Sequence, residues 1–203
     1  AISSSNLVAV HPALPINSIK DLIALAKARP GQLNDAGGQT GASSHLAAEL
    51  FKAMAGVDIV RVPYKGVGPA LNALIAGEVQ LSFTNPGAAA PHVKSGRLRA
   101  LAVTSAQPSA LLPGLPTVAA SGLPGYEAVS IFGMFAPART PAAIISRLNL
   151  EIVRHLNLAQ TREKFLNSGV ETVGSSPEQL AVTIKSEMTR MGKVIRDRSI
   201  RAE

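Results

Sequence analysis

The hydrophobic residues follow two patterns that alternate along the first half of the chain. Short apolar runs of strand length recur between longer segments whose apolar residues are spaced as on one face of a helix. The predicted strands are Leu7–Val10, Gln32–Ala36, Asp58–Val62, Val79–Phe83 and Leu98–Thr104. The predicted helices carry Ile19–Ala26, Leu46–Met54 and Leu71–Ile75 and the small residues Gly87–Val93. Strands that alternate with helices indicate an α/β fold with a mostly parallel sheet covered by helices on both faces.

The second half offers less sheet. A proline-rich passage from Pro108 to Gly125 is predicted to be an ordered connection. Beyond it we predict only two strands, Val129–Phe135 and Val170–Val173, and three helices, over 140–157, Ala159–Asn167 and from Ser176 toward the C-terminus. Two strands cannot bury three helical faces. We therefore predict one complete α/β lobe in residues 1–125 and segments of another, incomplete lobe in residues 126–203.

Charge does not indicate a nucleic-acid partner. The chain has 203 residues and a formal net charge of +7, but its basic residues are dispersed and no aromatic residues alternate with them. A nucleic-acid surface usually concentrates its charge. The basic stretch from Arg190 to Arg201 is explained by the solvated end of a C-terminal helix, where the helix dipole favours cations.

The absence of cysteine excludes a disulfide framework, a thiolate metal site and a cysteine nucleophile. No apolar run approaches the length of a membrane helix, about 18 residues. The chain begins with Ala1 and carries no signal peptide, so we expect it to be a processed or cut chain.

The stretch N-D-A-G-G-Q-T-G-A-S-S-H-L, Asn34 to Leu46, is the strongest candidate for chemistry. A strand runs through a glycine-rich turn directly into an amphipathic helix, whose first N–H groups lack helical partners and carry partial positive charge. Such a turn can bind an oxyanion or a carboxylate. The spacing alone favours an ordinary strand-to-helix turn without a ligand.

Catalysis and metal binding find little support in the sequence. His45 follows Ser43 and Ser44, but adjacent helical positions point in different directions and no acid is placed to orient the histidine. The other histidines, at positions 11, 92 and 155, lack metal-ligand spacing. The turn G-G-Q-T-G fits neither the dinucleotide-binding motif nor the P-loop. We expect no enzyme activity, no metal and no cofactor.

Several colinear segments resemble one family, the periplasmic substrate-binding receptors of tripartite tricarboxylate transporters, or Bug-type receptors. The resemblance covers nearly the whole chain. The segments are H-P-A-L-P (11–15), D-L-I-A-L-A-K-A-R-P-G-Q-L-N (21–34), G-A-S-S-H-L-A-A-E-L-F-K (41–52), G-V-D-I-V-R-V-P-Y-K-G (56–66), G-P-A-L-N-A-L-I-A-G-E-V-Q (68–80), P-H-V-K-S-G-R-L-R-A-L-A-V-T-S (91–105), L-P-T-V-A-A-S-G-L-P-G-Y-E (115–127) and F-G-M-F-A-P-A-R-T-P (132–141).

The resemblance implies a two-lobed fold like that of type II periplasmic binding proteins, with a small carboxylate ligand bound between the lobes. It implies export by a signal peptide, a periplasmic location, delivery of the ligand to membrane permease subunits, and lobe closure about hinges near Ser4–Leu7 and Gly125–Ser130. It also implies that this chain lacks the family's N-terminal portion. We therefore expect the isolated chain to bind weakly or to self-associate.

The resemblance further implies which residues bind the carboxylate, mainly through backbone amides of strand-to-helix turns. Transferred by position, these are Gly37, Gly38, Gly41, Ala42, Ser43, Ser44 and His45 in the first turn, Tyr64, Lys65 and Val67 in the second, Thr84 and Asn85 after a later strand, and Phe132 near a hinge. Asp35 departs from the family pattern and would repel an anion unless it points away. Thr84 stands where the family often has aspartate, and Ile131 stands where it often has tryptophan.

One alternative keeps a similar bilobal fold. The effector-binding domain of a LysR-type regulator has about this length, but it would need a DNA-binding helix-turn-helix upstream, and the segments quoted above favour the transporter receptors.

Overall fold

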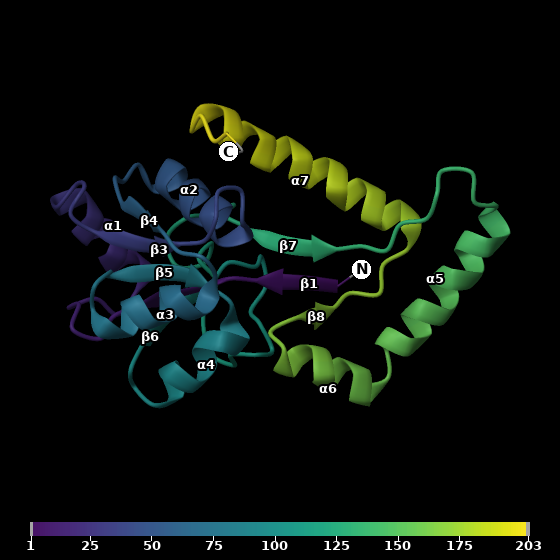
Figure 1. Ribbon diagram of the computed structural model, residues 1–203, viewed down its shortest axis with the longest axis horizontal. Helices are drawn as coiled ribbons and strands as arrows, with labels where there is room; N and C mark the ends of the chain where they lie inside the picture. The colour runs from purple at the N-terminus through teal and green to yellow at the C-terminus, as the bar shows by residue number, and fades with distance from the viewer. Residues whose placement is uncertain (1, 202–203) are drawn as a thin grey trace.

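The computed structural model describes residues 2–201, which form an α/β fold with two sheets. The elements are β1 (Ile2–Ser5), β2 (Leu7–Val10), α1 (Ile19–Ala28), β3 (Asn34–Gly37), α2 (Ser43–Ala55), β4 (Val60–Pro63), α3 (Val67–Ala76), β5 (Leu81–Thr84), α4 (Pro86–Lys94), β6 (Arg99–Val103), β7 (Val129–Phe132), α5 (Ala142–Leu156), α6 (Ala159–Asn167), β8 (Glu171–Thr172) and α7 (Pro177–Asp197). The large sheet has the order β4-β3-β5-β2-β6 and the small sheet the order β7-β1-β8. Figure 1 shows α1–α4 around the large sheet, α6 beside the small sheet, α7 reaching from the small sheet to α2, and α5 at the far end of the molecule.

Strand directions follow the prediction in the large sheet and depart from it in the small one. β3 pairs in parallel with β4 and β5, while β2 is antiparallel to both β5 and β6. Four of the five strands therefore run in one direction. In the small sheet β1 is antiparallel to β7 and to β8. The expectation of mostly parallel sheets does not hold there.

The strand β1 is absent from the sequence-based prediction, which placed residues 1–125 in one lobe. Ile2–Ser5 belongs to the small sheet, where it pairs with Val129–Phe132 and with β8. Its sequence I-S-S-S lacks the alternation of apolar and polar residues that marks a half-buried strand. Pairing with segments more than a hundred residues away supplies the order that the local pattern does not indicate.

The large sheet is buried on both faces. Along β2 the side chains alternate, so that Val8 and Val10 face the core under α1 and α2, while Leu7 and Ala9 face the core under α3. The first core includes the rings of Phe51, Phe83 and Tyr126, with centroids 5.5 Å apart for Phe51–Phe83 and 6.3 Å for Phe51–Tyr126. The chain has few aromatic residues, and three of them lie between α2 and the sheet. Their packing holds this helix on the sheet.

Two segments that pass between the sheets, at Asn6 and at Ala128, are both bound to Thr104. The amide of Asn6 donates to the Thr104 hydroxyl at 2.7 Å, and the Thr104 amide donates to the Asn6 carbonyl at 2.9 Å. The same hydroxyl donates to the Ala128 carbonyl at 2.6 Å, and the Ala128 amide donates to the Thr104 carbonyl at 2.8 Å. Thr104 is fully buried, so these bonds are shielded from water.

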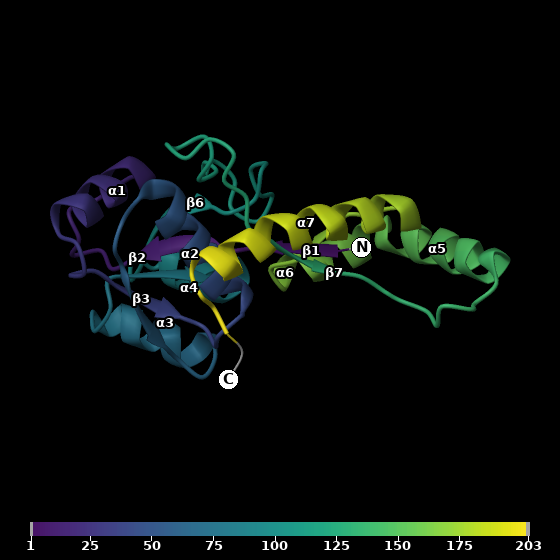
Figure 2. The same ribbon diagram turned by 90° about the horizontal axis from the view of Figure 1, so that it is seen from above.

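The helix α7 also connects the two parts. In Figures 1 and 2 it runs from the small sheet to α2. Its Arg190 pairs with Glu127 at 2.8 Å and with Glu187, and Arg198, just beyond its end, lies 3.5 Å from a carboxylate oxygen of Glu49 on α2. The position of α7 is therefore fixed against the helix that follows the glycine turn. None of the helices within residues 2–201 combines the length and apolar character that a membrane span requires.

The small-sheet part exposes much apolar surface. Phe135 is 74% exposed and Met188 is 71% exposed, and a hollow of about 460 Å³ separates α5, α7 and the segment after β7. Monomeric soluble proteins rarely leave such surfaces open. An incomplete lobe in residues 126–203, which stays a prediction, would leave such a surface open.

We expect the isolated 203-residue chain to self-associate through this surface, two copies covering each other's α5–α7 face and the unpaired edge of β7 or β8. Sedimentation velocity should show a sedimentation coefficient that rises with concentration. The double variant V182K/M188K, which places charges on two exposed apolar positions of α7, should shift the protein toward monomer. A single monomeric species at every concentration for the unmodified chain would contradict the expectation.

Candidate functional site

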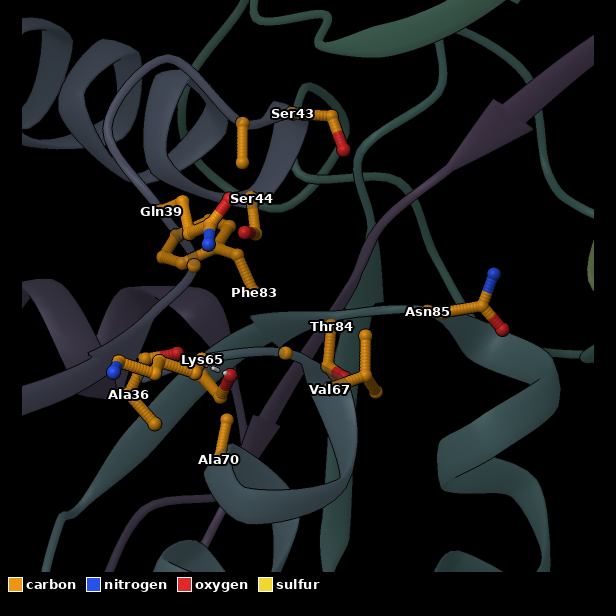
Figure 3. Close-up of a pocket in the computed structure, with 14 residues that line it drawn as sticks. Ala36, Gln39, Ser43, Ser44, Lys65, Val67, Ala70, Phe83, Thr84 and Asn85 are labelled. Atoms are coloured by element: carbon orange, nitrogen blue, oxygen red, sulfur yellow. Dashed lines mark hydrogen bonds between the residues drawn. The ribbon is translucent and has the colours of Figure 1, made fainter. Parts of the chain in front are cut away.

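A cavity of about 340 Å³ lies where β3 and β5 end and where α2, α3 and α4 begin. Its lining residues are Ala36, Gly38, Gln39, Ala42, Ser43, Ser44, Lys65, Gly66, Val67, Ala70, Ser82, Phe83, Thr84 and Asn85. In Figure 3 the serines of α2 lie on one side, Lys65 and Ala70 on the opposite side, and Thr84, Val67 and Asn85 beside them. Because strands β3 and β5 are parallel, the N-termini of three helices meet at one edge of the sheet, where partial positive charge accumulates.

The glycine turn forms the first wall of the cavity. α2 begins at Ser43. Its first helical hydrogen bond runs from the Leu46 amide to the Ala42 carbonyl, over 2.9 Å. The amides of Ser43 and Ser44 therefore lack helical partners and are available to a ligand. Gly41 has a φ of +80°, which other residues rarely adopt.

His45 stabilises the turn from outside the cavity. Its Nδ1 accepts a hydrogen bond from the Gly41 amide at 3.0 Å, which requires that this nitrogen carry no proton. Burial, reinforced by the charge of Arg61, lowers the pKa of His45 and keeps the imidazole neutral. None of the hydrogen bonds among residues 2–201 joins His45 to Ser43 or Ser44. The geometry thus gives His45 a structural role.

Three residues on the other walls differ in what they offer a ligand. Lys65 is the one charged side chain among those lining the cavity, and no acidic side chain lines it. Asn85 caps α4, since its Oδ1 accepts from the Ala88 amide at 3.0 Å. Thr84 is only 4% exposed, and its hydroxyl takes part in none of the hydrogen bonds among the described residues. A hydroxyl that lines a cavity and has no protein partner is ready to bond a ligand or a water molecule.

The structure brings most of the predicted site residues together. Eight of them line the cavity: Gly38, Ala42, Ser43, Ser44, Lys65, Val67, Thr84 and Asn85. Gly37 and His45 are buried beside the turn, and Gly41 faces a neighbouring hollow near β7. Tyr64 packs against the core under α3. Phe132 does not reach the cavity, because it lies on β7 in the small sheet and is 52% exposed. Ligand binding by these residues stays a prediction.

Asp35 points away from the cavity, which removes the repulsion that its position in the sequence suggested. It is 2% exposed on the face of β3 opposite to Ala36, and neither of its oxygens has a hydrogen-bond partner among the described residues. Burial raises the pKa of Asp35 to about 7, against the attraction of Lys52. With a pKa of about 7, Asp35 is protonated in about half of the molecules near pH 7.

Sequence reasoning missed part of the lining. Ser82 lies two residues before Thr84 on β5, and its hydroxyl donates to the Ala36 carbonyl at 2.9 Å. The alternation along the strand was the available signal for this residue. Gln39 also lines the cavity and was not among the predicted site residues. Groups of three or more metal-ligating side chains do not occur in residues 2–201.

Comparisons with known proteins agree with this architecture. The sequence model described as the tripartite tricarboxylate transporter family receptor, TctC, matches residues 1–200. The R. palustris protein Rpa4515, solved with adipate, superimposes with a TM-score of 0.80 and 39% identity over 96% of this chain and 65% of its own. MatC from Rhodopseudomonas palustris, solved with bound malate, superimposes with a TM-score of 0.77 and 27% identity over 96% of this chain and 67% of its own.

The periplasmic binding protein BugD gives a TM-score of 0.79 and 27% identity over 100% of this chain and 68% of its own. The chain spans only 53% of a relative from Pseudomonas sp. (strain P51) that is 39% identical over 178 residues. The match thus covers almost all of this chain but only part of its relatives. The chain belongs to the tripartite tricarboxylate transporter receptor family.

Proposed function

We propose that this chain is the ligand-binding part of a periplasmic receptor that binds a small carboxylate and delivers it to the membrane permease of a tripartite transporter. In this proposal the large sheet with its helices forms the second lobe, and the small sheet forms part of the first. The ligand binds in the cavity at the edge of the large sheet, facing the first lobe. The lobes close by rotating about hinges in the segments near Asn6 and Ala128.

The electrostatics of the cavity carry the proposal. Three helix N-termini and Lys65 supply positive potential, and the cavity has no acidic side chain to oppose it. Neutral hydrogen-bonding groups from Gln39, Ser43 and Thr84 add donors. Such a site favours an anion with several oxygen atoms and offers no counter-charge for an ammonium group.

The relatives support a carboxylate over other anions. The structures of Rpa4515 and MatC were solved with adipate and malate, and both are dicarboxylates. The role is one of binding rather than catalysis, as in the receptors of the family. The alternative of a LysR-type effector domain finds no support, since the matching sequence model is that of transporter receptors.

Replacing Lys65 with methionine is expected to weaken adipate binding about 5- to 10-fold, because an exposed charge at the edge of a site contributes on the order of 1 kcal/mol. Isothermal titration calorimetry with adipate, malate and benzoate would measure the loss and rank the ligands. The variant K65R, which keeps the charge, should bind within about twofold of the unmodified chain. Unchanged affinity of K65M would remove Lys65 from the site. Failure of every carboxylate to bind would contradict the proposed function.

A further inference from the structure

Arg61 reaches the glycine turn from outside the cavity. It lies on β4, the strand at the edge of the large sheet, and its side chain extends beneath the turn between β3 and α2. Its Nη2 donates to the Gly38 carbonyl at 2.6 Å, and both terminal nitrogens lie 3.5 Å from the hydroxyl of Thr40. Arg61 does not line the cavity, whereas Gly38 does. The guanidinium therefore contacts the turn on the side away from the ligand space.

The absence of a side chain at position 37 makes room for this arginine. A Cβ on Gly37 would lie 2.8 Å from Cγ of Arg61, 3.0 Å from its Nε and 3.2 Å from its Cδ. The separation of 2.8 Å is shorter than carbon atoms tolerate, and the other two are tight, so the arginine stem would have to shift. Gly37 and Arg61 thus form a matched pair, since a larger residue at position 37 would displace the arginine stem and break the bond to Gly38.

The bond to the Gly38 carbonyl sets the direction of one amide. In a trans peptide the carbonyl of Gly38 and the N–H of Gln39 point in opposite directions. Holding the carbonyl toward Arg61 turns the N–H of Gln39 the other way, toward the space that Gly38 and Gln39 line. Within residues 2–201 no hydrogen bond uses this N–H. A charge-assisted bond of this length is strong enough to fix the peptide plane.

We propose that Arg61 is a positioning residue of the carboxylate site: it orients the Gln39 amide toward the ligand and places a positive charge behind the turn without touching the ligand. The expected effect on affinity rests on the proposed function. The expected effect on the conformation of the turn does not, because it can be measured without a ligand. Arg61 also lies opposite the buried Asp35 in the pairing of β3 with β4, so its effects on stability and on binding must be measured separately.

The test compares R61M, R61K and the control R97M, each with the full chain. Arg97 is an exposed arginine beyond the far end of α4, bonded to the Ser95 hydroxyl. R61M should weaken adipate binding about 10- to 50-fold, the usual effect of losing a hydrogen bond to a charged group. R61K retains the charge with fewer donors and should recover part of the loss, about 3- to 5-fold weaker than the unmodified chain. R97M should bind as the unmodified chain does.

A readout on the ligand-free chain separates this inference from the proposed function. In amide NMR spectra, R61M should shift the Gln39 and Thr40 signals and speed exchange of the Ala42 amide, which bonds to the Gln39 carbonyl at 2.9 Å, by about 10-fold or more. If no carboxylate binds even the unmodified chain, the proposed function fails while these signals still decide the role of Arg61. Unchanged turn signals in R61M, or a lowered melting temperature with unchanged adipate affinity, would overturn the inference.

Discussion

Replacing Thr84 with aspartate, the residue that the family often carries at this position, tests whether position 84 faces the ligand carboxylate in this chain: if it does, the substitution is expected to weaken carboxylate binding by at least about 100-fold at about pH 8. Thr84 is buried and faces the cavity with an unpaired hydroxyl. Two like charges about 5 Å apart repel each other by about 3 kcal/mol at an effective dielectric constant of about 20, and we expect a carboxylate at position 84 and a ligand carboxylate in the cavity to form such a pair. The substitution changes the sign of the local potential while barely changing the volume of the side chain.

The matched control is T84N, which has the size of aspartate without its charge. It should bind a carboxylate within about fivefold of the unmodified chain, because an amide can still donate a hydrogen bond. Titrations of T84D at falling pH should recover affinity as the introduced carboxyl group, buried and therefore of raised pKa, becomes protonated. Equal dissociation constants for T84D and T84N at all pH values would place the ligand away from Thr84.

Replacing Asp35 with asparagine is expected to make the protein more stable at alkaline pH, relative to the unmodified chain, than it is at acid pH. Burial raises the pKa of Asp35 from 3.8 to about 7, so the folded state holds a proton that the unfolded state releases at lower pH. A folded-state pKa above the unfolded value means that stability is full below pH 3.8 and is lost as the pH rises toward about 7. The shift of about 3 units corresponds to about 4 kcal/mol.

Urea unfolding of D35N and of the unmodified chain, from about pH 4 to about pH 8, measures this difference. The gap in the free energy of unfolding between the two proteins should change by about 4 kcal/mol in favour of D35N over that range. The unsatisfied amide of asparagine shifts the whole curve but does not alter its slope. The exposed Asp58 supplies the control, D58N, whose curve should run parallel to that of the unmodified chain. A constant gap for D35N would show that Asp35 is ionised in the fold.

The sequence predicted the large sheet well because its signals are local. The apolar runs that became β2, β5 and β6 and the glycine turn before α2 depend on neighbours within a few residues. β1 was missed because its pairing with β7 is set by residues far along the chain. Phe132 was assigned to the site by resemblance, whereas the structure places its exposed ring on the small sheet.

The same difference between local signals and distant pairings explains which features of the site the sequence predicted. The helix N-termini of the cavity follow from strand-to-helix turns that the sequence shows directly. The role of Arg61 depends on β4 lying beside β3 in one particular register, Asp35 opposite Arg61, and no pattern within either strand indicates that register. The direction of the Asp35 side chain follows from the alternation along β3, but only once the face that bears the cavity is known.

The four hydrogen bonds of Thr104 have a mechanical consequence. They occupy its amide, its carbonyl and both capacities of its hydroxyl, and they join the segments at Asn6 and Ala128 to one side chain and one peptide unit. Because these bonds hold the two segments to each other, we expect them to move together in any rotation between the sheets. Such a rotation would change the backbone angles of both segments while the distance between them at Thr104 stays about the same.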